Sequence, residues 1–168
     1  MIEYRNDRGQ RHRDNDLPAV IWSNGDKLWY KNGQQHRDGD RPAFERNDGL
    51  QEWWVNGVLH RDNDLPAIMC PSGINAWWVN GKVHREGGLP AIDGEHKLWW
   101  LNGRKLSAPQ ATAYTSFCQR MQEKKKIKAQ KKIYFWWIQI CYDMDHPSGC
   151  GQRMAQKNLD VFETMMSV

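Results

Sequence analysis

A single motif recurs at a fixed spacing through residues 1–107. Its His-Arg pair, the Pro-Ala pair that follows and the Gly that precedes each return every 24 residues. A fixed period of this length is typical of repeat architectures, in which one supersecondary element buries its apolar face only against its neighbours. We therefore expect four units, preceded by an irregular start. The His-Arg pairs are His12 and Arg13, His36 and Arg37, His60 and Arg61, and His84 and Arg85.

Each unit contains two signals for a chain reversal. An aromatic pair leads directly into Asn-Gly, whose residues both accept the positive φ of a tight hairpin turn. A second turn signal, such as residues 23–26, lies between Pro-Ala and the next aromatic pair. The short segments between turns are rich in Trp, Tyr, Val and Ile, which favours strands over helices. We predict a mainly β repeat built as an antiparallel β-hairpin meander, with the Pro-containing stretch as a bulge or an edge crossing.

The chain contains ten Trp, and most of them belong to the aromatic pairs. Adjacent residues on a strand face opposite sides, so only one member of each pair can line a surface groove while the other is core. We expect an aromatic ladder that replaces a conventional core. A groove that cages a choline or stacks on a sugar ring is the alternative. The predicted ladder consists of Trp29, Trp53, Trp77 and Trp99.

The recurring His, Arg and Asp residues have a structural and a metal-binding interpretation. Equivalent positions in a hairpin stack lie about 10 Å apart, which is too far for two imidazoles to share one ion with bonds of about 2 Å. The Asp pairs lack the further ligands of a calcium loop. We therefore predict no metal, no cofactor and no catalytic residue. The four His-Arg pairs are instead expected to hold each hairpin onto the next.

The remaining composition indicates a soluble, intracellular chain. Residues 1–107 contain 15 basic and 15 acidic residues, whereas residues 108–168 contain 9 and 5, so the net charge of +4 lies in the C-terminal segment. The sequence contains neither an apolar run of about 18 residues nor a signal-like start. The four cysteines lack a close metal-ligand spacing and are expected to be reduced thiols.

From about Pro109 the apolar spacing changes to that of a helix. Tyr114, Phe117, Cys118 and Met121 fall on one face of it. We predict a second domain, residues 108–168, that forms a helical hairpin. Its second helix would carry Met154, Val161, Phe162 and Met165.

Two segments of the predicted first helix are candidates for binding. A basic patch could contact nucleic acid or an anionic membrane surface, or could be a solvated face beside protein partners. The apolar end that follows should not face water and is the expected partner-binding segment. The basic patch is Arg120, Lys124, Lys125, Lys126, Lys128 and Lys131, and the partner-binding residues are Lys132, Ile133, Tyr134, Phe135, Trp136 and Trp137.

Hairpin repeats with an aromatic residue just before Asn-Gly resemble the MORN family of β-hairpin repeats. A closer resemblance is to repeat proteins that marseillevirus-like large DNA viruses encode in many copies. It is carried by "WYKNGQQHRDGDRPA" (29–43), "KKIYFWWIQICYD" (131–143) and "GCGQRMAQKN" (149–158). The resemblance covers nearly the whole chain and implies neither an enzymatic activity nor catalytic residues.

These observations lead to one expected function and two alternatives. We expect a non-enzymatic structural protein of a large DNA virus, a minor capsid or other virion component in a multi-copy assembly with other viral structural proteins. It would be located in the virion, and in the host cytoplasm during assembly. The alternatives are a ligand-binding or host-interaction module that uses the Trp-lined surface, and a nucleic-acid tether that uses the basic patch.

Overall fold

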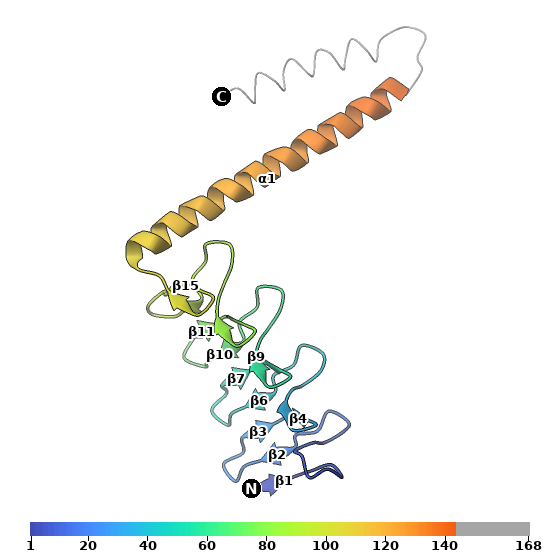
Figure 1. The fold of residues 1–168 in the computed structure, drawn as a ribbon, viewed down its shortest axis with the longest axis vertical. Coiled ribbons are helices and arrows are strands. Elements are labelled where there is room, and N and C mark those ends of the chain that lie inside the picture. The colour runs from blue at the N-terminus through green and yellow to red at the C-terminus, as the bar shows by residue number, and fades with distance from the viewer. Residues whose placement is uncertain (144–168) are drawn as a thin grey trace. The chain divides into compact units, whose positions relative to one another are not determined.

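The computed structural model describes the backbone of residues 1–143 and the side chains of residues 1–135. Two-residue strands form an antiparallel sheet in which the strands follow one another in chain order (Figure 1). Between them, each Asn-Gly closes a separate two-stranded hairpin. The main sheet contains β1 (Ile2–Glu3), β2 (Val20–Ile21), β3 (Lys27–Leu28), β6 (Phe44–Glu45), β7 (Gln51–Glu52), β10 (Ile68–Met69), β11 (Asn75–Ala76) and β14 (Ile92–Asp93). The hairpins are β4 (Tyr30–Lys31) with β5 (Gln34–Gln35), β8 (Trp54–Val55) with β9 (Val58–Leu59), β12 (Trp78–Val79) with β13 (Lys82–Val83), and β15 (Trp100–Leu101) with β16 (Arg104–Lys105).

The predicted fold class is confirmed: a mainly β hairpin repeat followed by a helix. In all four hairpins the Asn of Asn-Gly has a φ of 50° and the Gly also has a positive φ, as a type I′ turn requires. The stretch between His-Arg and Pro-Ala is a loop with two successive left-handed residues, such as Asn15 (φ 59°) and Asp16 (φ 56°). The second helix of the predicted helical hairpin falls within residues 144–168 and lies outside the described residues.

The start of the chain, predicted to be irregular, is a hairpin unit of the same kind. The Tyr4 amide donates to the carbonyl of Ala19, as the Trp29 amide donates to that of Ala43. A longer turn replaces Asn-Gly here, and the backbones of Arg5 and Arg11 form an antiparallel bridge across it. Tyr4 therefore occupies the position that Trp occupies in the later units.

The core is a column of small and large residues, one of each per unit. The Ala of each Pro-Ala pair is fully buried, and Trp29, Trp53 and Trp77 are only 5–8 % exposed. Each Trp lies at the corner between a strand of the main sheet and a hairpin, and its amide donates to the carbonyl of the buried Ala that follows. The buried alanines are Ala19, Ala43, Ala67 and Ala91.

Helix α1 (Ala108–Asp143) begins directly after Ser107, whose backbone amide is capped by Gln110. The backbone amide and the hydroxyl of Ser107 donate to the Gln110 side chain, and the Ser107 carbonyl accepts from the Ala111 amide. The chain divides into two compact units, Met1–Gln119 and Arg120–Val168, so the first three turns of α1 belong with the repeats.

The start of α1 covers the fourth loop. Ala111 is buried, and the Thr115 hydroxyl donates to the Gly88 carbonyl at 2.8 Å. Phe117, predicted to lie on the apolar face, is instead 53 % exposed. The docked face is Ala111, Thr115 and Cys118, because Gly88 lacks a side chain and lets the helix backbone approach at Thr115.

Candidate functional site

The Arg of the second, third and fourth His-Arg pairs joins two successive units. In the second unit, Arg37 donates from Nε and Nη2 to both carboxylate oxygens of Asp16, at 2.8 Å each. Its Nη1 donates to the carbonyl of Pro42 in its own loop, and its guanidinium lies 3.8 Å from the Trp29 ring centroid. Arg61 and Arg85 repeat these contacts with Asp40 and Asp64 of the preceding units. A planar guanidinium on an aromatic ring suits this two-pronged contact, because Arg presents its donors in a rigid fork.

The ladder Trp residues also contact the preceding unit. The indole N–H of Trp29 donates to the carbonyl of Asp16, and that of Trp53 to the carbonyl of Asp40. Trp77 and Trp99 make the same contact with Asp64 and Gly88. In each unit, the backbone carbonyl of one left-handed loop residue therefore accepts a hydrogen bond from the Trp of the next unit. In the first three units this residue is an Asp, and its carboxylate also accepts hydrogen bonds from the Arg of the next unit.

The histidines join units in the opposite direction along the chain. His60 Nδ1 accepts from the backbone amide of Asn80, in the next Asn-Gly turn, at 3.2 Å. Because a backbone amide only donates, the ring proton is on Nε2, which donates to Asp62 at 3.1 Å. His12, His36 and His84 accept from Asn32, Asn56 and Asn102 in the same way. Seven of the eight His and Arg positions thus make contacts between units, and Arg13 contacts only its own unit.

Replacing His60 tests this contact. His60→Gln should lower the free energy of unfolding by about 1 kcal/mol, because the Asn80 amide loses its acceptor. His60→Asn should cost less, since its amide oxygen can take the place of Nδ1. Urea unfolding gives the stabilities, and hydrogen exchange should show the Asn80 amide exchanging faster only in His60→Gln. Equal exchange rates in the two variants would contradict the assignment.

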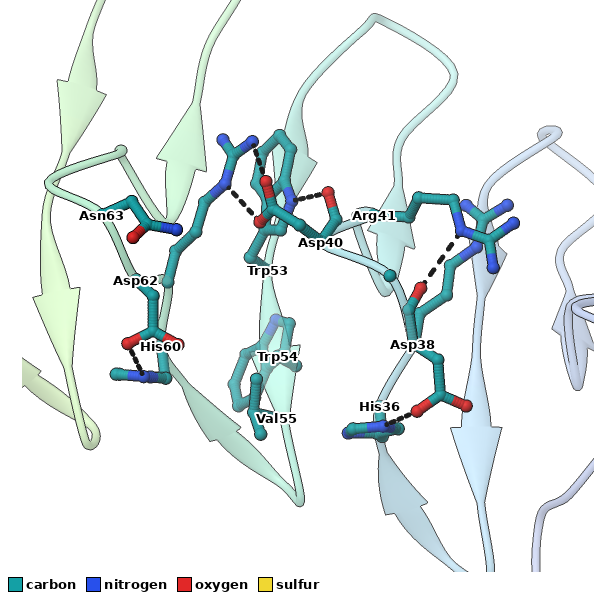
Figure 2. Close-up of a pocket in the computed structure, with 13 residues that line it drawn as sticks. His36, Asp38, Asp40, Arg41, Trp53, Trp54, Val55, His60, Asp62 and Asn63 are labelled. Carbon is teal, nitrogen blue, oxygen red and sulfur yellow. Dashed lines mark hydrogen bonds and ion pairs between the residues drawn. The ribbon is translucent and has the colours of Figure 1, made fainter.

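Between successive units these side chains line shallow grooves. The groove between the second and third units has a volume of about 220 Å³ and is lined by residues including His36, Trp54 and His60. Figure 2 shows the hydrogen bonds His36–Asp38 and His60–Asp62 in this groove, which Trp54 also lines. The corresponding grooves before and after it measure about 150 and 460 Å³.

The second aromatic of each pair differs from unit to unit in its hydrogen bonding, which was not predicted. The Trp54 indole N–H donates to Glu52, two residues earlier, at 2.8 Å. The corresponding indole nitrogens of Trp78 and Trp100 are buried without a hydrogen-bond partner among the described residues. The difference is visible in the sequence, because Ala76 and Leu98 stand where the third unit has Glu52.

Asp16 makes the stability of the array sensitive to acid. Hydrogen bonds from the Arg37 guanidinium hold the pKa of the Asp16 carboxyl below its ordinary value. A carboxyl whose pKa is lower in the folded state adds stability that is present above its unfolded pKa, about 3.9, and is lost as the pH falls through its folded pKa.

Urea unfolding at pH values from 7 down to 3 measures this contribution. Wild type should lose more stability with acid than Asp16→Asn, which removes the titrating group. Asp7→Asn, at an exposed turn residue, is the matched control and should behave as wild type. Parallel pH profiles for wild type and Asp16→Asn would refute the role of this carboxylate.

Most of the described side chains in the two segments of α1 predicted to bind are open to solvent, and Tyr134 is half-buried. All six residues of the basic patch are exposed. Ile133 and Phe135 are 66 % and 63 % exposed. The side chains of Trp136 and Trp137 lie outside the described residues.

Neither a metal cluster nor a membrane-spanning helix is found in the part of the chain that the structure describes. Among the described residues, no three His, Cys, Asp or Glu side chains could hold a metal ion together. Within residues 1–143, α1 is not apolar enough over any 18-residue stretch to cross a membrane. No protein-family model, curated protein or solved structure matches the chain.

Proposed function

We propose that this chain is a non-enzymatic structural and interaction protein, a minor capsid or other virion component of a large DNA virus. One observation carries the non-catalytic part. The polar residues that would suggest chemistry make structural contacts instead: His60 bonds to Asn80 of the next unit and to Asp62 of its own, and Arg61 bonds to Asp40 of the preceding unit. The viral setting rests on the resemblance of the repeat and of the C-terminal segment.

In this proposal the partner is another viral structural protein, bound through residues 132–137 of α1. The exposed Ile133 and Phe135 support this, because burying large apolar side chains under a partner is favourable and stabilises the complex. The repeats would serve as the body that presents the helix.

Mass spectrometry of purified particles tests the proposal, and absence of the chain from them would refute it. A chain ending at Gln119 retains the whole first compact unit and should fail to enter particles. Ile133→Ser with Phe135→Ser in the full chain is the matched change within the segment. Normal incorporation of either variant would refute docking through α1.

A nucleic-acid tether is the second candidate. Seven basic residues between Arg120 and Lys132 are exposed, with one acidic residue, Glu123, among them. Contacts with phosphates make affinity fall steeply with salt. The test is binding of duplex DNA at 50 and 200 mM salt. Binding would favour the tether if it weakens at the higher salt and is abolished by the combined substitutions Lys124→Gln, Lys125→Gln and Lys126→Gln. Binding that does not depend on salt would exclude the tether.

A further inference from the structure

The Arg of the His-Arg pair has a complete set of contacts in three units and an incomplete set in the first unit. In the three full copies the Arg makes three kinds of contact: Nη1 to the Pro carbonyl of its own loop, the guanidinium on its own aromatic residue, and Nε with Nη2 to the Asp of the preceding unit. The Arg–Asp distances lie between 2.8 and 3.0 Å throughout.

Arg13, in the first unit, makes only the first two. Its Nη1 donates to the Pro18 carbonyl at 3.2 Å, and its guanidinium lies 3.6 Å from the Tyr4 ring centroid. No carboxylate among the described residues accepts from its Nε or Nη2. The Arg13 guanidinium shares two contacts with the other three arginines, but its Nε and Nη2 have no carboxylate acceptor among the described residues.

The surface around Arg13 is also uncovered. Tyr4 is 37 % exposed, whereas Trp29, in the equivalent position of the next unit, is 5 % exposed. Strand β1 pairs with β2 only and leaves its other edge without a partner strand among the described residues. Among the described residues, Arg13 and the outer edge of β1 therefore lack contacts that their counterparts make in later units.

We propose that this end binds a partner protein through an aspartate-bearing turn. The Asp carboxylate would take the two-pronged side of Arg13, in the position that Asp16 has on Arg37, and an adjoining extended segment would pair with the free edge of β1. Tyr4 would lie under the turn as Trp29 lies under the loop of Asp16. Surface Arg–carboxylate contacts of this geometry combine affinity with orientation.

The partner is a different protein and not a second copy. The turns of this chain that carry the required Asp already use it on Arg37, Arg61 and Arg85. In the fourth turn Gly88 replaces the Asp, and the start of α1 covers it. Within the described residues, none of the four loops between His-Arg and Pro-Ala in a second copy therefore offers a free Asp. This proposal concerns the end of the array away from α1 and stands apart from docking through residues 132–137.

The experiment supplies the missing side within one chain, so that its outcome does not depend on finding the partner. The test protein is the full chain in which a second copy of residues 29–50 replaces Met1, so that the copied strand and turn precede Ile2. The copied Asp40 then precedes Arg13 by 22 positions, against 21 between the original Asp40 and Arg61, because the turn of the first unit is one residue longer. Four chains are compared: this extended chain, the same with the copied Asp→Asn, and each of these with Arg13→Lys, which keeps the charge but loses the fork.

The copied Asp→Asn should lower the melting temperature by about 4 °C in the chain with Arg13, and by much less when Arg13→Lys is present. The NMR signal of the Arg13 Nε–H should also move on extension and return with Asp→Asn. Equal melting shifts in both backgrounds, or an unchanged Nε–H signal, would overturn the proposal. Sedimentation of the natural chain should show a monomer. If the chain instead self-associates and Arg13→Lys abolishes this, the partner would be a second copy and not a different protein.

Discussion

Trp53→Ala should lower the free energy of unfolding by about 3–5 kcal/mol, the cost of removing a large aromatic side chain from a core. Trp53 is 6 % exposed, its indole N–H donates to Asp40 of the preceding unit, and Arg61 lies 3.8 Å from its ring. The substitution thus removes core volume and both side-chain contacts of Trp53 at one junction. In an array whose units contact only their neighbours, the loss at one junction should also broaden the unfolding transition.

Circular dichroism in urea measures this without relying on Trp fluorescence. Trp53→Phe is the matched variant, since it keeps most of the ring and loses the N–H, and it should cost about 1 kcal/mol. A loss below 1 kcal/mol for Trp53→Ala would show that the ladder does not hold the array together.

Gly88→Ala should release the start of α1 from the fourth unit. A Cβ at Gly88 would lie 2.8 Å from the Thr115 Cα, and that backbone atom cannot move without shifting the helix. The residue also has a φ of +76°, which costs a non-Gly residue about 1–2 kcal/mol by itself. We expect a total loss of about 3 kcal/mol, with the excess over backbone strain coming from the displaced helix.

Gly73→Ala separates the two contributions. Gly73 has a φ of +86°, and a Cβ there would have no atom within 4 Å, so the substitution tests backbone strain alone. Hydrogen exchange of the amides in residues 111–119 should rise in Gly88→Ala and stay unchanged in Gly73→Ala. Equal stability losses in the two variants, with equal exchange, would mean that Gly88 plays no part in docking α1.

The hairpin fold and its turns could be predicted from the sequence because both depend on local chemistry that recurs. Asn-Gly supplies two residues that tolerate positive φ, and four copies at one spacing identify the unit. The direction of the contacts could not be predicted in the same way. A repeated Arg and a repeated Asp fit equally well within one unit or across two, and only the structure shows Arg37 reaching back to Asp16.

The two ends of the array were harder to predict because the motif changes there. At the start, Tyr4 and a longer turn break the pattern, although Tyr4 precedes His12 at nearly the spacing of Trp29 and His36. At the other end, "REGG" stands where earlier loops carry Asp, and no His-Arg pair follows. Together these two signals could have indicated that a different element covers the fourth loop.

The contacts between units have a consequence for how the chain folds. Their side-chain hydrogen bonds join residues only 11 to 26 positions apart, from Trp99–Gly88 to Asn6–Asn32. Short sequence separations make the loops that close during folding small, which lowers their entropic cost and favours fast folding for a β protein. Any adjacent pair of units can therefore serve as the nucleus, from which order spreads one unit at a time in either direction.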